Sequence, residues 1–174
     1  MVVATVPKAN FFELEGGLKI HYVDVGEGPT VVCLHGNPTW GVYFRDVVAA
    51  LSSRYRVIVP DHLGCGLSSK PQQHTYRLSD RIDHVSQLLD ALQVKRFSLV
   101  AHDWGGAIGM GLAVQRPEDV WGVILSNTAA FRSNSMHWQL SLCRSKVGEY
   151  LIRRWNLFSK AACYMATAKR RLDD

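Results

Sequence analysis

The chain has 174 residues, 47% of them hydrophobic, and a formal net charge of +5, which suffices for one sizeable hydrophobic core. No apolar run reaches the roughly 20 residues of a membrane-spanning helix, and the first residues lack the pattern of a signal peptide, so neither segment is expected. The positive excess lies in residues 132–174, with 9 Lys and Arg against 3 Asp and Glu; no nucleic-acid motif surrounds it, and we interpret it as a solvated helical face rather than a nucleic-acid surface.

Alternating apolar runs and amphipathic stretches predict an α/β protein. The chain opens with two strands around Gly16-Gly17, which predict a hairpin with a two-residue turn. We expect strands at residues 11–15, 18–25, 30–34, 55–59, 96–100 and 120–125. We expect helices near residues 40–52, over 78–92 with Ser79 or Asp80 as its cap, and after residue 103. This alternation predicts a mostly parallel sheet that helices cover on both faces.

The run Ala101-His102-Asp103-Trp104-Gly105-Gly106 places a carboxylate where a strand turns sharply into a helix. Small residues two positions before Asp103, and two and three after it, permit the tight turn of a nucleophile elbow. A carboxylate is already ionised at neutral pH, so it attacks carbon without an activating base. An Asp that merely caps a helix is the alternative interpretation, but it does not explain small residues on both flanks.

A second stretch, His35-Gly36-Asn37-Pro38, directly follows the apolar strand at 30–34. In proteins with a nucleophile elbow, the loop after this strand faces the elbow and supplies one oxyanion donor. The backbone N–H of the residue after the nucleophile, here Trp104, supplies the other. The side chains of Asn37 and Trp104 also carry N–H groups that can hold a leaving anion beside Asp103. Each well-placed donor is worth roughly 3–4 kcal/mol.

These two stretches together resemble the α/β-hydrolase superfamily, and within it the haloalkane dehalogenases and their relatives. Residues 60–68 and 127–131 resemble most the β-lactone decarboxylases of bacterial long-chain olefin biosynthesis. The resemblance implies an α/β-hydrolase core over residues 1–131 and the beginning of a helical cap over residues 132–174. It also implies that the following residues support the loop and the elbow: His35, Gly36, Pro38, His102, Gly105 and Gly106.

The implied reaction is decarboxylation of a cis-dialkyl β-lactone to an olefin, through a covalent ester or anhydride on Asp103. Haloalkane dehalogenase is the nearest alternative. Epoxide hydrolase is another, although those enzymes usually carry an aromatic residue where Asn37 stands. A non-catalytic truncated remnant is the alternative from a different class. The resemblance implies a small apolar substrate, no metal or organic cofactor, and possible assembly with other olefin-pathway enzymes.

The departures from the family pattern concern the remaining catalytic residues. Hydrolases of this fold order them as nucleophile, acid and histidine, with the histidine after the last strand. All seven histidines of the chain are wrongly placed for that role, and Asn127 stands where some dehalogenases carry the acid. We therefore expect an N-terminal part of a larger enzyme, without its catalytic histidine and acid and not competent for turnover alone. The four cysteines show no metal-binding spacing, which favours reduced thiols and a cytoplasmic protein.

Overall fold

The computed structural model describes residues 9–128, 143, 145–157 and 160. The chain divides into two compact units, residues 1–131 and residues 132–174, and each unit is described by itself. The assignment of the second unit to a cap stays a prediction.

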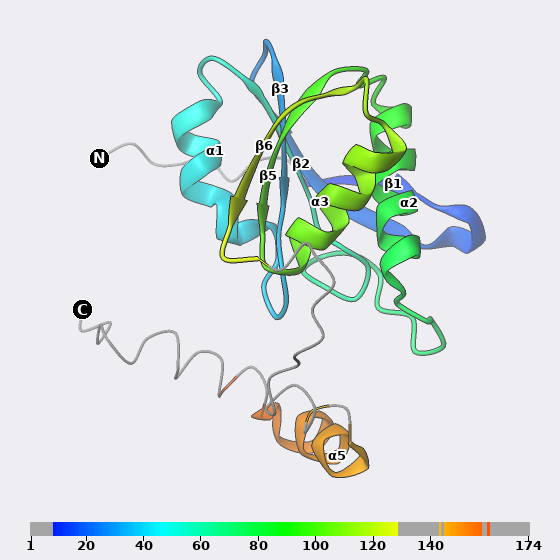
Figure 1. The fold of residues 1–174 in the computed structure, drawn as a ribbon. Helices are drawn as coiled ribbons and strands as arrows, with labels where there is room; N and C mark the ends of the chain where they lie inside the picture. Colours follow the sequence, from blue (N-terminus) through cyan, green and yellow to red (C-terminus); the bar gives the residue numbers. More distant parts are fainter. Residues whose placement is uncertain (1–8, 129–142, 144, 158–159, 161–174) are drawn as a thin grey trace, which may run out of the picture. The chain divides into compact units, whose positions relative to one another are not determined.

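The described part of the first unit forms a six-stranded sheet in the order β1-β2-β4-β3-β5-β6 (Figure 1). Its strands are β1 (Asn10–Glu13), β2 (Lys19–Val25), β3 (Thr30–Leu34), β4 (Arg56–Pro60), β5 (Phe97–His102) and β6 (Val120–Ser126). The first three strands of that order pair antiparallel, and β4, β3, β5 and β6 pair parallel. The predicted mostly parallel sheet is therefore confirmed, with β3 and β5 as the inner strands of its parallel part.

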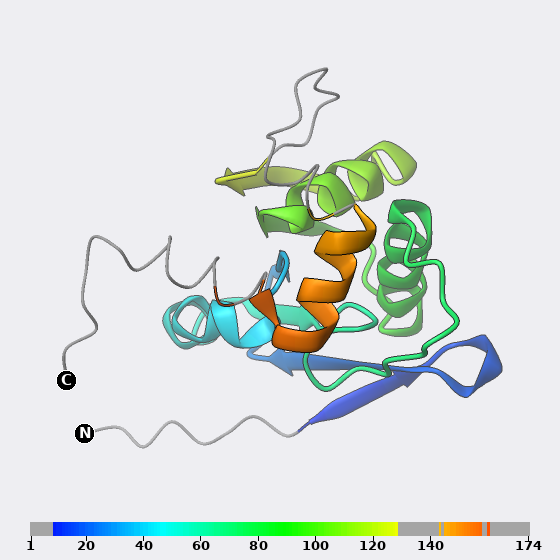
Figure 2. The ribbon, with the colours of Figure 1, turned by 90° about the horizontal axis from the view of Figure 1, so that it is seen from below.

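Helices cover both faces of this sheet (Figure 2). They are α1 (Arg45–Leu51), preceded by the 3₁₀ turn η2 (Gly41–Phe44), and α2 (Leu78–Ala91) and α3 (Trp104–Gln115). Successive side chains of a strand point to opposite faces. Val31 and Cys33 accordingly pack with Phe44 on the α1 side, whereas Val32 and Leu34 belong to the core under α2 and α3. Each fully buried aliphatic side chain of this kind contributes about 1.5–3 kcal/mol.

The opening hairpin differs from its prediction. Its strands end at Glu13 and restart at Lys19, and the 3₁₀ turn η1 (Glu15–Gly17) lies between them in place of a two-residue turn. Leu14 is buried, and its N–H donates to the carbonyl of Leu18 at 2.7 Å, so this pair closes the hairpin. The burial of Leu14 therefore favours this longer turn over the predicted two-residue turn.

One helix start differs from the sequence interpretation, and at another the structure selects one of two predicted residues. The segment expected as one helix over 40–52 begins with η2 and becomes α-helical only at Arg45. At the start of α2, Asp80 rather than Ser79 binds a backbone N–H that the helix leaves unpaired: its Oδ2 accepts the N–H of Arg77 at 3.3 Å. The Ser79 hydroxyl donates instead to Asp80 Oδ1 at 3.1 Å.

The described part of the second unit contains α5 (Lys146–Trp155). Ser145 caps its start by accepting the N–H of Gly148 at 3.0 Å, and Asn156 ends it with a left-handed backbone. Other aromatic and apolar residues that the sequence assigns to the cap lie outside the described residues: Trp138, Leu142, Phe158 and Tyr164. None of the helices in the described ranges is both long and apolar enough to cross a bilayer.

Candidate functional site

Asp103 occupies the single-residue turn between β5 and α3 and has a backbone φ of 52° and ψ of −125°. A non-glycine residue rarely adopts positive φ, and such positions persist where the surrounding structure enforces them. Two donors enforce this one. The N–H of Gly106 and the hydroxyl of Thr128 both donate to the Asp103 carbonyl, at 3.0 Å and 2.6 Å. The sharp turn that the sequence predicted is thus present.

The two glycines after Trp104 have a steric role at this turn. A Cβ on Gly105 would collide with the backbone carbonyl of Leu34, at the end of β3. A Cβ on Gly106 would collide with the side chain of Thr128, just after β6. Small residues are therefore needed because the start of α3 lies directly against its neighbours on both sides.

The Asp103 side chain points toward the loop after β3. Its Oδ1 accepts the backbone N–H of Asn37 at 2.8 Å. A Cβ on Gly36 would collide with this carboxylate, so glycine is what lets it approach the loop. Within the described ranges, Oδ2 accepts no hydrogen bond. One oxygen is therefore held by an N–H donor while the other stays available to react, which is the state that a carboxylate needs to attack an electrophilic carbon.

Asn37 and Trp104 are both neighbours of Asp103: the first donates its backbone N–H to the carboxylate, and the second follows it in the chain. Trp104 is the first residue of α3, and 51% of its surface is exposed. The Asn37 side-chain oxygen accepts from the thiol of Cys65 at 3.7 Å. Neither the Asn37 amide nitrogen nor the Trp104 indole N–H has a hydrogen-bond partner in the part of the chain that the structure describes. Both N–H groups are thus available for an anion.

His35 and His102 brace the backbone around the site. His35 is fully buried; its Nδ1 lies 2.9 Å from the Gly36 carbonyl, and its Nε2 accepts the N–H of His62 at 3.0 Å. Burial lowers the pKa of His35, which agrees with a neutral ring that donates through Nδ1 and accepts through Nε2. His102 Nδ1 lies 3.1 Å from the Ser126 carbonyl, and its ring stacks on Tyr43 at 4.5 Å between centroids.

Pro38, the remaining predicted loop residue, follows Asn37 through a cis peptide bond. The structure therefore brings the two predicted stretches, residues 35–38 and 101–106, together around one carboxylate. No histidine in the described ranges hydrogen-bonds to Asp103, and His137 lies outside those ranges. Among the same residues, no group of three or more His, Cys, Asp or Glu side chains could hold a metal ion.

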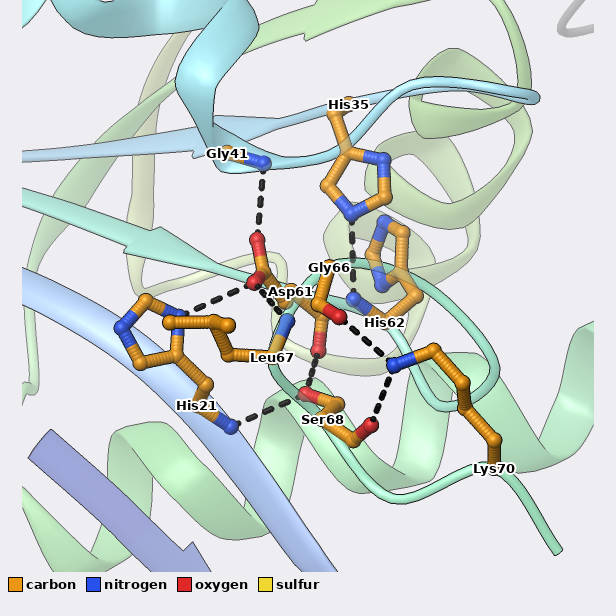
Figure 3. Close-up of polar contacts among 9 residues, drawn as sticks. All are labelled: His21, His35, Gly41, Asp61, His62, Gly66, Leu67, Ser68 and Lys70. Carbon is orange, nitrogen blue, oxygen red and sulfur yellow. Dashed lines mark hydrogen bonds and ion pairs between the residues drawn. The ribbon is translucent and has the colours of Figure 1, made fainter. Parts of the chain in front are cut away.

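Asp61 was missed as a site residue by the sequence interpretation. It directly follows β4, is fully buried, and forms the centre of a polar cluster (Figure 3). Its Oδ1 accepts the N–H of Gly41 at 2.7 Å, and its Oδ2 accepts the N–H of Leu67 at 2.8 Å and lies 2.9 Å from His21 Nδ1. One carboxylate thus joins β2 to the loops after β3 and β4.

Ser68 completes this cluster from the same loop. Its hydroxyl donates to the Asp61 carbonyl at 2.6 Å and accepts the N–H of His21 at 2.9 Å. Lys70 then donates to the carbonyls of Gly66 and Ser68, at 2.6 Å and 3.1 Å. A Cβ on Gly66 would collide with the Asp61 carboxylate. The available signal in the sequence was a carboxylate directly after an apolar strand, followed by a glycine-rich loop.

Comparison with known proteins shows the family to which the chain belongs. A family model described as the alpha/beta hydrolase fold matches residues 29–156. A cis-3-alkyl-4-alkyloxetan-2-one decarboxylase from Shewanella oneidensis is 41% identical over 98% of this chain and 56% of its own length. Haloalkane dehalogenase 2 from Mycobacterium tuberculosis is 36% identical over 87% of this chain and 53% of its own length.

Among solved structures, the haloalkane dehalogenase DbeA from Bradyrhizobium elkani superposes with a TM-score of 0.81 at 28% identity. The match covers 89% of this chain and 56% of that one. The chain thus spans about half the length of the curated relatives it matches.

Proposed function

The chain belongs to the alpha/beta hydrolase fold family, and on that premise we propose that Asp103 is the nucleophile of an enzyme that converts cis-dialkyl β-lactones to olefins. The observation that carries this proposal is the Asp103 carboxylate at a positive-φ turn. Its Oδ1 accepts the Asn37 N–H, and its Oδ2 accepts no hydrogen bond from the residues that the structure describes. Similarity to an oxetanone decarboxylase, at 41% identity, supports the choice of substrate class.

In the first step, Asp103 Oδ2 attacks a carbon of the strained ring, and a ring C–O bond breaks. Attack at the alkyl carbon gives an alkyl ester of Asp103 and frees a carboxylate. Attack at the acyl carbon gives an anhydride and an alkoxide. In both cases the released anion is held by the side-chain N–H groups of Asn37 and Trp104, and the adduct contains every atom of the lactone.

From the alkyl ester, the second step needs no water. The bond to the carboxylate carbon breaks, its electron pair forms the C=C bond, and the ester oxygen leaves with its own pair. The products are CO₂, the olefin and the original Asp103 carboxylate. The enzyme's residues contribute by excluding water and by orienting the ester for this elimination.

Haloalkane dehalogenation is the second candidate. It is supported by the paired N–H groups of Asn37 and Trp104, which suit a halide, and by 36% identity to a haloalkane dehalogenase. Here Asp103 displaces halide and forms an alkyl ester, which water must then hydrolyse. That hydrolysis needs a general base, a role that we assign to the histidine that, with its acid, follows the nucleophile in hydrolases of this fold.

The wider setting is also proposed. A small apolar substrate fits both candidate reactions. Free thiols at Cys33 and Cys65 are in keeping with a reducing, cytoplasmic location. The decarboxylase assignment suggests assembly with other enzymes of olefin synthesis. Nucleic acid is not proposed as a partner.

The test is intact-mass measurement of the 174-residue chain after exposure to a cis-dialkyl β-lactone or to 1-bromobutane. Because we expect this chain not to turn over by itself, the lactone is expected to give an adduct equal to the whole lactone, followed by at most one equivalent of CO₂ and olefin per chain. For 1-bromobutane, dehalogenation gives a butyl adduct and bromide. Circular dichroism and thermal unfolding establish that the sample is folded.

Asp103→Asn provides the control, because the amide keeps the side-chain shape and loses the attacking charge. Bromide release without olefin would favour the dehalogenase. A folded wild-type chain that gives neither product nor adduct would favour a non-catalytic remnant.

A further inference from the structure

Cys65 contacts the side chain that the proposed mechanism uses to hold the leaving anion. Its Sγ lies 3.7 Å from Asn37 Oδ1, within the range of a hydrogen bond from a thiol. The two residues are 28 positions apart, on the loops after β4 and β3. Neither sequence spacing nor charge singled out this cysteine, because its partner is brought to it only by the parallel pairing of the two strands.

The loop that carries Cys65 is held on both sides of this residue. The Cys65 N–H donates to the His62 carbonyl at 2.9 Å, and the Ser68 N–H donates to the Cys65 carbonyl at 3.1 Å. Leu67, two residues later, is bound to the buried Asp61 carboxylate (Figure 3). The backbone of Cys65 is therefore held in place by the Asp61 cluster rather than by the contact of the thiol with Asn37.

The thiol acts as the donor in this contact. Burial raises the pKa of Cys65, and the positive charge of Arg81, together with a hydrogen bond from its side chain to the sulfur, opposes this effect only in part. The group is accordingly a neutral S–H at pH 7, and the Asn37 oxygen is the acceptor that faces it. The amide nitrogen occupies the other corner of the side chain and is left free by this contact. It has no partner within the described ranges.

We propose that Cys65 is a positioning residue, whose thiol binds Asn37 Oδ1 and thereby presents the amide nitrogen to the anion that Asp103 displaces. This inference rests on the proposed function. Without the thiol, the Asn37 amide rotates freely on the loop surface. The donor then has to be ordered during each reaction, which slows the bond-breaking step without weakening substrate binding.

The kinetic test follows the first turnover of the 174-residue chain with a cis-dialkyl β-lactone, and in parallel with 1-bromobutane. It yields a maximal rate constant and a half-saturating concentration for each variant. Cys65→Ala is expected to lower the maximal rate about five- to tenfold and to leave the half-saturating concentration within about twofold. Cys65→Ser retains a donor and is expected to lie between Cys65→Ala and wild type.

A double-mutant cycle with Asn37→Ala separates positioning from general destabilisation. Asn37→Ala keeps the backbone N–H that binds Asp103 and removes the amide that Cys65 orients. In that background, Cys65→Ala is expected to change the maximal rate less than about twofold. An equal loss in both backgrounds, or a change confined to half-saturation, overturns the positioning role. Absence of any reaction in folded wild type refutes the proposed function itself and is recognised without the variants.

A second measurement does not depend on turnover. In a ¹⁵N-labelled chain, the side-chain NH₂ pair of Asn37 is assigned as the pair that disappears in Asn37→Ala. We expect two dispersed resonances in wild type that move toward free-amide positions in Cys65→Ala. Resonances that already lie at free-amide positions in wild type, or that do not move in Cys65→Ala, contradict the contact.

Discussion

Two aspartates follow two strands that both pair with β3, and their environments differ sharply. Asp61 comes directly after β4, is fully buried, and has three N–H donors on its carboxylate. Asp103 comes directly after β5, is half-buried, and has one donor among the described residues, on Oδ1. Both residues sit at the carboxyl end of a parallel strand, where the chain must turn away from the sheet.

The difference shows how one residue type serves two purposes in similar places. A buried carboxylate is stable only when donors replace the water it has lost, and three donors on Asp61 meet that need. Its charge is thereby committed to holding three segments together. Asp103 is held through its backbone instead, by Gly106 and Thr128 on its carbonyl. The side chain is left with an oxygen that has no structural duty in the described residues.

The largest expected effect comes from neutralising each carboxylate in turn. Asp103→Asn is expected to slow adduct formation about 10³-fold or more, since the attacking charge is lost. It should change the free energy of unfolding by less than about 1 kcal/mol, because a single hydrogen bond is involved. Intact-mass kinetics and urea unfolding of the same samples measure both quantities. A variant that reacts at the wild-type rate would remove Asp103 from the mechanism.

Asp61 is expected to show the opposite balance. Asp61→Ala leaves one buried and two part-buried donors unpaired and should lower the free energy of unfolding by about 3–5 kcal/mol. Asp46→Ala is the matched control, because its contact with Arg45 is exposed, and it should cost less than about 0.5 kcal/mol. Urea unfolding monitored by tryptophan fluorescence compares the two. Similar losses in both variants would mean that the Asp61 cluster contributes little.

Much of this fold could be predicted from local pattern. Thr30–Leu34 and Arg56–Pro60 are short apolar runs bounded by turn residues, and their burial on both faces is what such runs indicate. The approach of Asn37 to Asp103 could also be anticipated, because each follows a strand of the same parallel sheet. The small residues around Asp103 predicted the turn, since only a close backbone approach requires them.

The features that were missed depend on partners far away in the sequence. Gly41 bonds to Asp61 across 20 residues, and His21 bonds to it across 40. No periodicity encodes such pairs, so the 3₁₀ start before α1 and the Asp61 cluster could not be read from the chain. The hairpin turn was mispredicted for a related reason. Its length is decided by the burial of Leu14, which needs the packed neighbours Ile20 and Leu88.

A smaller effect is expected where α3 packs against the segment after β6. Gly106→Ala puts a methyl group against the Thr128 side chain and should cost about 1–3 kcal/mol of unfolding free energy. Thr128→Ala removes two of the three colliding atoms, so the double variant should lose less than the sum of the single losses. Gly105→Ala collides with a backbone carbonyl of Leu34, and Thr128→Ala is not expected to relieve it. Additive losses for Gly106→Ala and Thr128→Ala would contradict this packing.

The smallest expected effect is a dependence of the unfolding free energy on pH, which arises from His62, the residue after Asp61. Burial lowers the pKa of His62 well below its ordinary value of 6.5. In the unfolded chain His62 takes up a proton as the pH falls through about 6.5, whereas in the folded chain it stays neutral. Stability is therefore present in full above pH 6.5 and is lost progressively as the pH falls toward the folded-state pKa.

His62→Phe keeps an aromatic ring at this position and cannot be protonated. Between pH 7.5 and 5.5, one such group costs the wild type about 1.4 kcal/mol of unfolding free energy, and the variant should lose that much less over the same interval. Urea unfolding at the two pH values measures the difference. If wild type and His62→Phe lose the same unfolding free energy over this interval, the acid sensitivity does not arise from His62. Other groups of the Asp61 cluster would then have to account for it.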